Sequence, residues 1–299
     1  MQCEELTIIS SNEVQAAIEN IFINEGAEGI KNDDQLFRQK DSTEIKLSGY
    51  FLSTKKVSAR IPAIKAKIMN LKNFGLNPGS VAIKLKPLED SQWSVEWEKY
   101  YHARRVTRYL TIVPSWEQYQ KKQADEKVIS LDPGKAFGTG THPTTILAMR
   151  ALEETIRGNE KVIDVGTGSG VLSIAAKALG AGKIYAYDIE EDALASARKN
   201  VKLNPFATDI EIRLNNLLSG ISYTADLIVA NVLPEVLLEL LPHIPAHLKA
   251  GGCFIASGII LDKKDTLKKA VLEQALHIEQ VATDEKWVSI IARKPSSKE

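Results

Sequence analysis

The stretch Val162-Ile163-Asp164-Val165-Gly166-Thr167-Gly168-Ser169-Gly170 decides how this 299-residue chain folds. An apolar run with a central carboxylate ends in three alternating glycines, and apolar residues at helical spacing follow over 171–176. The pattern predicts a strand, a tight turn and a helix, which form the first unit of a nucleotide-binding α/β sheet. Glycine permits the sharp turn and lets a ligand approach the main chain, and the helix start presents unpaired N–H groups to that ligand.

The spacing of the glycines indicates the kind of ligand. A dinucleotide site favours G-x-G-x-x-G, whereas the third glycine here, Gly170, comes one position early. With Asp164 two residues before Gly166, the D-x-G-x-G-x-G arrangement resembles the first motif of S-adenosylmethionine-dependent methyltransferases. Two alternatives stay open: a nicotinamide-binding Rossmann domain, which the spacing disfavours, and a glycine-rich turn without function, which the strand-turn-helix context disfavours.

Length, charge and cysteine content set outer limits. The length leaves room for about two domains. The charges balance, with 38 Lys+Arg against 38 Asp+Glu, which argues against binding to a phosphate backbone in bulk. Cys3 and Cys253 share no motif, so neither a disulfide framework nor a metal site is expected. No signal peptide or membrane span is visible, so we expect a cytoplasmic protein with no membrane partner.

Three segments are expected along the chain. Strand and helix patterns in a βαββαβ-like order predict a small two-layer α+β domain over residues 1–90, with Ser11 or Asn12 capping its first helix. Residues 91–127 are expected to be a linker, and 128–299 a Rossmann-like α/β domain. That second domain is expected to carry seven strands, the last two of which form an antiparallel hairpin.

The linker contains two patterns with open interpretations. Aromatic side chains at helical spacing either pack a joint between domains or stack on a ligand. Three arginines then lie in a stretch expected to be one strand, and they either form a solvated basic face or face an acidic partner. These residues are Trp93, Trp97, Tyr100, Tyr101, Arg104, Arg105 and Arg108.

Three places at the edge of the predicted sheet are suited to bind a ligand. The glycine- and threonine-rich loop 132–145 leads into a helix that Thr141 can cap, although a purely structural turn is the alternative. Asp188 ends the next strand about 20 residues after the glycine turn, where such folds place the carboxylate that binds ribose hydroxyls. The alternative is a helix cap. Asn215 and Asn216 are weaker candidates for the edge of an adenine.

Asn231 ends the buried strand 226–231, and ligands of open α/β sheets bind outside such strand ends. Its amide offers an acceptor and a donor, although a simple turn asparagine is the alternative.

Together these features resemble a known family. The loop 137–145, the motif 164–170, Asp188 and Asn231 within Ala230-Asn231-Val232-Leu233-Pro234 are similar to the bacterial methyltransferases that modify large-subunit ribosomal protein eleven. The stretches 287–291 and 97–101 are similar too.

The resemblance implies a ferredoxin-like recognition domain joined to a class I methyltransferase domain. It implies an S-adenosylmethionine-dependent protein-lysine N-methyltransferase that modifies the N-terminal α-amine and lysine ε-amines of large-subunit ribosomal protein eleven, with no direct nucleic acid required. It also implies that Thr145, Gly166, Asp188 and Asn231 bind S-adenosylmethionine.

Methyl transfer to an amine requires no metal, and no catalytic residue is assigned. A lysine with a pKa near ~10.4 must lose its proton, and desolvation and a nearby sulfonium both favour that loss. We expect the Asn231 carbonyl to accept N–H groups of the amine. His142 is a candidate base, although a lone histidine in a polar loop is more often structural.

Two other functions remain as alternatives. Methyltransferases acting on base amines resemble one another in an Asn-Pro-Pro-aromatic motif, which Asn231-Val232-Leu233-Pro234 does not match. A non-catalytic binding module would be expected to have lost cofactor-binding positions, and every such position is present here.

Overall fold

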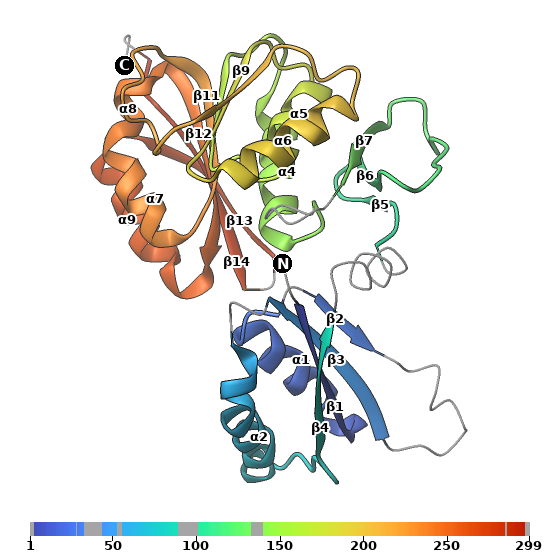
Figure 1. Cartoon of the computed structure of the whole chain (residues 1–299). Helices are drawn as coiled ribbons and strands as arrows, with labels where there is room; N and C mark the ends of the chain where they lie inside the picture. Colours follow the sequence, from blue (N-terminus) through green and yellow to red (C-terminus); the bar gives the residue numbers. More distant parts are fainter. Residues whose placement is uncertain are drawn as a thin grey trace. The chain divides into compact units, whose positions relative to one another are not determined.

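The computed structural model describes residues 3–27, 29–32, 44–52, 56–88, 101–132, 140–284 and 286–296. The chain divides into two compact units, Met1–Tyr100 and Tyr101–Glu299 (Figure 1). The division falls inside the expected linker, since residues 101–127 belong to the second unit. Trp93, Trp97 and Tyr100 lie outside the described residues, so their two interpretations stay open.

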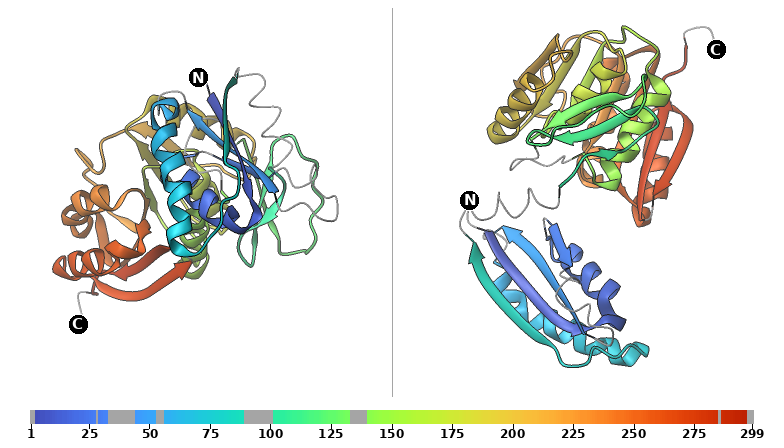
Figure 2. Two further views of the ribbon diagram at one scale, coloured as in Figure 1. Left: turned by 90° about the horizontal axis from the view of Figure 1, so that it is seen from below. Right: turned by 90° about the vertical axis from the view of Figure 1, so that its right-hand side faces the viewer.

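The first unit has the expected ferredoxin-like arrangement. Its elements follow the order β1-α1-β2-β3-α2-β4, and the strands form an antiparallel sheet in the order β2-β3-β1-β4 (Figure 2). The strands are β1 (Cys3–Ser11), β2 (Gly29–Asn32), β3 (Glu44–Leu52) and β4 (Ala82–Leu88). The helices are α1 (Gln15–Asn24) and α2 (Ile61–Asn70), with 3-10 turns at Asn12–Val14, Val57–Arg60 and Leu71–Phe74.

The core of this unit follows from alternating and helical apolar patterns. Leu6 and Ile8 of β1 point to the same face of the sheet, where they are fully buried with Phe22 of α1 and Ile64 of α2. The ring of Phe22 lies so close to β3 that a Cβ at Gly49 would come within 2.8 Å of it. Ser11 caps the turn before α1 as expected, since its side chain accepts from Glu13 N–H.

The second unit contains the expected seven-stranded sheet, in the order β10-β9-β8-β11-β12-β14-β13. Five neighbouring strands are parallel, and β13 and β14 form the antiparallel hairpin at one side. This is the class I methyltransferase topology, which confirms the expected fold class. The strands are β8 (Val162–Val165), β9 (Ile184–Asp188), β10 (Ile210–Leu214), β11 (Ala225–Asn231), β12 (Leu248–Ile260), β13 (His277–Asp284) and β14 (Trp287–Arg293).

Helices cover both faces of this sheet (Figure 1). One face carries α4 (Pro143–Thr155), α5 (Val171–Ala178) and α6 (Glu191–Lys202). The other carries α7 (Pro234–Leu240), α8 (Ile244–His247) and α9 (Lys264–Glu273), with 3-10 turns at Leu241–His243 and Leu261–Lys263. Because both faces are covered, the central strands β8 and β11 are buried along most of their length.

A three-stranded sheet in the order β5-β6-β7 corrects two expectations. The stretch expected as one strand is broken by a turn at 106–109, so β5 (Arg104–Arg105) pairs back on β6 (Leu110–Pro114). The strand β7 (Lys127–Leu131) was not expected from the sequence. Asn200 of α6 and Asn204, two residues beyond the end of α6, hold β7 through their side chains. Asn204 Oδ1 accepts from Ser130 N–H at 2.9 Å, and Asn200 Oδ1 accepts from Asp132 N–H at 2.8 Å. Arg104 and Arg105 are exposed.

Within the described ranges, no helix is long and apolar enough to cross a membrane.

Candidate functional site

The glycine turn has the conformation that its sequence predicts. Gly166, Gly168 and Gly170 have φ values of 73°, 55° and 80°, a region that residues with a Cβ rarely occupy. A Cβ at Gly166 would lie 2.5 Å from Val232 Cγ1, and one at Gly170 would lie 3.1 Å from Ala197 Cβ. The backbone therefore turns from β8 into α5 in a space that only glycine fits, and the start of α5 faces the carboxyl end of the sheet.

Asp188 lies beside this turn at the end of β9. Its Oδ2 accepts from Gly168 N–H at 2.8 Å and its Oδ1 accepts from Glu190 N–H at 3.1 Å. The cap residue of α6 is Glu190, so Asp188 does not occupy the cap position of that helix. A carboxylate has about four acceptor sites, so two remain for the hydroxyl groups of a ligand.

Thr145 and Asn231 are brought together from distant parts of the chain. Thr145, in the first turn of α4, is fully buried, and Asn231 Nδ2 donates to its Oγ1 at 3.4 Å. The other amide atom, Asn231 Oδ1, is buried and has no hydrogen-bond partner among the described residues. A buried acceptor without a partner is costly, so this oxygen is suited to receive a donor from a ligand.

Asp164 is a second buried acceptor beside the turn. It is fully buried, and its Oδ2 accepts from the hydroxyls of Thr167 and Ser173, both at 2.7 Å. Burial raises the pKa of its carboxyl to about 6, although the two hydroxyls oppose this effect. Its Oδ1 has no partner among the described residues. The sequence identified Asp164 only as part of the motif, because its burial depends on packing against α5.

His142 has a structural role at the start of α4. It is the N-cap residue, since its Nδ1 accepts from Thr144 N–H at 3.3 Å, and the expectation that Thr141 caps this helix is wrong. The imidazole packs against the ring of Trp287 at 5.1 Å between centroids. Burial, and then the charge of Lys286, lowers the pKa of His142. Residues 133–139 of the preceding loop lie outside the described part of the chain.

The remaining candidates take part in local structure. Asn215 Nδ2 donates to Leu217 O at 3.0 Å, a bond that closes the turn after β10, and Asn216 is exposed. The thiol of Cys253 is buried in β12, and burial raises its pKa to about 11. In the described ranges no three His, Cys, Asp or Glu side chains are grouped to hold a metal ion.

The sequence patterns did not predict a role for Ser257. It pairs with Asn231 across β11 and β12, and its Oγ donates to Thr144 O at 2.8 Å. This bond links the centre of the sheet to the first turn of α4. A serine inside an apolar strand is the only sequence signal for it.

Comparison with known proteins identifies the family. A family model described as ribosomal protein L11 methyltransferase (PrmA) matches residues 2–295. The ribosomal protein L11 methyltransferase of Limosilactobacillus reuteri is 46% identical over 97% of this chain and 98% of its own length, and that of Bacillus subtilis is 40% identical over 98% of this chain and 100% of its own. A crystal structure of the ribosomal protein L11 methylase of Lactobacillus delbrueckii subsp. bulgaricus is 40% identical, with a TM-score of 0.62, over 65% of this chain and 100% of that one. The chain therefore belongs to the ribosomal protein L11 methyltransferase (PrmA) family.

Proposed function

We propose that this protein transfers methyl groups from S-adenosylmethionine to the N-terminal α-amine and lysine ε-amines of ribosomal protein L11. The observation that carries the proposal is the Oδ1 of Asn231, which is buried and has no hydrogen-bond partner in the part of the chain that the structure describes. It lies at the carboxyl end of β11, the strand next to the one that leads into the glycine turn. An acceptor in that position suits an amine that carries N–H groups.

Four residues are proposed to hold the methyl donor. Gly166 has the left-handed conformation that the turn requires, Asp188 offers acceptor sites for ribose hydroxyls, and Thr145 and Asn231 lie together at the end of β11, on the other side of β8 from β9. The fit is supported by the glycine conformations and by Asp164 Oδ1, a buried acceptor beside the turn that has no partner among the described residues. When bound, S-adenosylmethionine supplies a methyl group on a positively charged sulfonium, which is attacked by a neutral amine.

The residues of the chain then act mainly on the amine. Asn231 Oδ1 accepts one N–H group and so directs the nitrogen lone pair, which is the positioning effect that accelerates a displacement. Transfer of the amine from water into the site disfavours its protonated form and lowers its pKa. Neither effect requires an ionisable side chain as a base.

The first unit is proposed to recognise the protein substrate. It has its own buried core and the ferredoxin-like sheet order, and the family resemblance implies that this fold is a recognition domain. Its substrate is a ribosomal protein, so the proposed place of action is the cytoplasm, and the balanced net charge agrees with contacts that do not require nucleic acid.

Incubation with labelled S-adenosylmethionine tests the proposal. We expect label in purified L11, none in naked ribosomal RNA, and a loss of about 100-fold in turnover for Asn231→Ala because the amine is no longer positioned. Label in the RNA, or in no acceptor, would contradict the proposal, and the first result would favour a base-amine methyltransferase.

A further inference from the structure

Val232, the residue after Asn231, lies between two glycines of neighbouring segments. A Cβ at Gly166, just beyond β8, would come within 2.5 Å of Val232 Cγ1. A Cβ at Gly258 in β12 would come within 2.3 Å of Val232 O. The order β8-β11-β12 places these glycines on opposite sides of the chain that leaves β11. Both contacts are closer than real Cβ atoms permit, so Val232 fills the space that each glycine leaves.

The backbone at Gly258 is shaped for this contact. Gly258 has a φ of 84°, and the pairing of β12 with β14 shifts register between Ala256 and Ile259. A glycine in the left-handed region at such an irregularity is typical of a β-bulge. The bulge lies directly after Ser257, whose Oγ bonds Thr144 O. One short segment of β12 therefore contacts both the start of α4 and the chain after Asn231.

We infer that Val232 is a positioning residue that couples the glycine turn of the methyl-donor site to the amide of Asn231. The inference rests on the proposed function, which assigns donor binding to the glycine turn and positioning of the amine to Asn231. The side chain of Val232 contacts the glycine turn, and its backbone continues directly from Asn231. A displacement of Asn231 therefore also displaces the turn. Close-packed contacts of this kind transmit displacements instead of absorbing them.

A comparison of two glycine variants of one strand tests the effect on turnover. Gly258→Ala forces the carbonyl of Val232 to move. Gly251, the site of the control variant Gly251→Ala, lies in the same strand with a similar φ of 74°, and among the described residues no atom lies within 4 Å of a Cβ added there. Both variants carry the strain of a positive φ, so the control isolates the contact with Val232. With L11 as acceptor we expect turnover to fall about 100-fold for Gly258→Ala, the cost of a displacement of about 1 Å. The affinity for S-adenosylmethionine should fall as well, but by less than turnover, because Val232 also contacts the glycine turn.

Equal turnover in the two variants would overturn the inference. So would a loss of methyl-donor affinity in Gly258→Ala as large as its loss of turnover, because the contact would then support the donor site alone. Val232→Ala serves where Gly258→Ala does not fold, since it removes two methyl groups and creates no clash. It is expected to lower turnover more than the affinity for S-adenosylmethionine, and unchanged turnover would contradict the inference.

A double-mutant cycle tests the coupling without any acceptor. Calorimetry would measure the affinity for S-adenosylmethionine of the wild type, Gly166→Ala, Val232→Ala and the double variant. The clash of the new Cβ with Val232 Cγ1 is absent in the Val232→Ala background, so Gly166→Ala is expected to cost at least about threefold less affinity there. Additive effects would overturn the inference. If the cycle shows coupling but the wild type does not methylate L11, the result would contradict the proposed function and leave the inference standing.

Discussion

Asp164 is a single carboxyl whose burial has a measurable consequence. Its folded pKa of about 6 lies above the ordinary value of 3.8, because desolvation disfavours the charged form. A raised pKa means that the folded state binds the proton more tightly than the unfolded state. The ionised group therefore lowers stability above pH 6, and this penalty is relieved as pH falls from 6 towards 3.8.

We expect Asp164→Asn to abolish this pH dependence. Relative to the variant, the wild type should gain about 1 kcal/mol of unfolding free energy between pH 8 and pH 5, since one pKa unit corresponds to about 1.4 kcal/mol. Urea unfolding of both proteins at the two pH values measures the difference. A difference that is constant with pH would show that Asp164 titrates at its ordinary value.

Substitutions of His142 can distinguish a helix-capping role from a catalytic role. As an N-cap, His142 contributes to the stability of α4, and its lowered pKa leaves it neutral at pH 7. His142→Ala is expected to cost about 1 kcal/mol of stability. His142→Asn retains a capping acceptor and should recover most of that loss. Both variants should keep the pH–rate profile of the wild type, and the disappearance of an inflection from that profile in both variants would instead identify His142 as a base.

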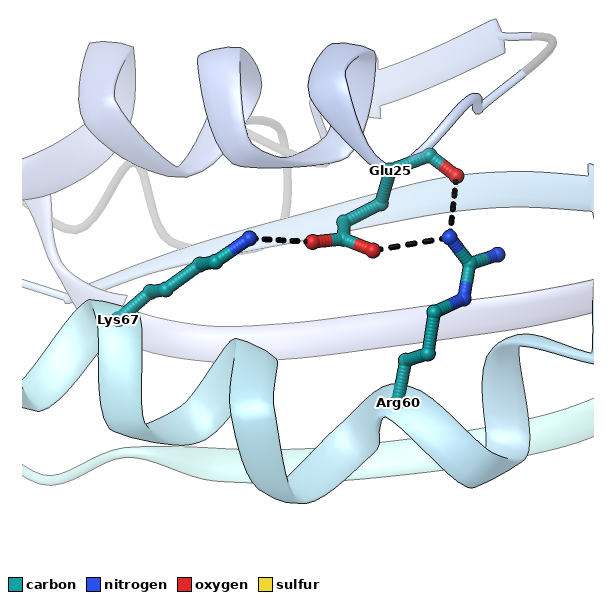
Figure 3. A network of polar contacts seen from close by, with 3 residues as sticks. All are labelled: Glu25, Arg60 and Lys67. Atoms are coloured by element: carbon teal, nitrogen blue, oxygen red, sulfur yellow. Dashed lines mark hydrogen bonds and ion pairs between the residues drawn. The ribbon is translucent and has the colours of Figure 1, made fainter.

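Glu25, the residue directly after α1, links α1 to α2 in the first unit through a network of polar contacts (Figure 3). The carboxylate is 9% exposed, and it accepts from Arg60 Nη1 at 2.9 Å and from Lys67 Nζ at 2.6 Å. Arg60 also donates to the backbone carbonyl of Glu25 at 3.2 Å. The acid is buried while its two cations are partly exposed, so most of the desolvation cost lies on Glu25.

We expect Glu25→Gln to lower the stability of the first unit by about 2 kcal/mol, the range of hydrogen bonds to charged groups. The exposed pair Lys269–Glu273, at 3.9 Å, supplies the control, because Glu273→Gln should change stability by less than about 0.5 kcal/mol. Hydrogen exchange of α1 and α2 measures the effect within the full chain. Equal protection in the two variants would show that the Glu25 network adds nothing to the unit.

The elements also show what a sequence can predict. The run 162–170 predicts its strand, turn and helix because the glycine conformations are local requirements. The short strand β7 was not predicted because its pairing depends on β6 and on the side chains of Asn200 and Asn204. The residues of the candidate site divide in the same way into those that the sequence predicts and those that depend on tertiary contacts. Asp188 and Asn231 follow from strand ends, whereas the contacts of Ser257 and Val232 arise only when the register of β11 and β12 is set.

Each of the two units has a hydrophobic core cluster among its described residues. One core cluster lies entirely within residues 6–68 and is packed by side chains up to Leu85, and the other cluster lies entirely within 163–292. Each unit thus has a buried apolar core, as is expected of a domain. All four proposed methyl-donor residues lie in the second unit.

Removal of residues 1–100 should therefore separate donor binding from substrate recognition. We expect the fragment 101–299 to bind S-adenosylmethionine within about twofold of the full chain, because every proposed contact is retained. Its kcat/KM for L11 should fall by at least about 100-fold, since binding energy from parts of a substrate far from the reacting atoms contributes to turnover. Calorimetry and a labelled-methyl assay measure the two quantities. A fragment that methylates L11 as efficiently as the full chain would place recognition in the second unit, and a fragment that folds but has lost donor affinity would make the first unit part of the donor site.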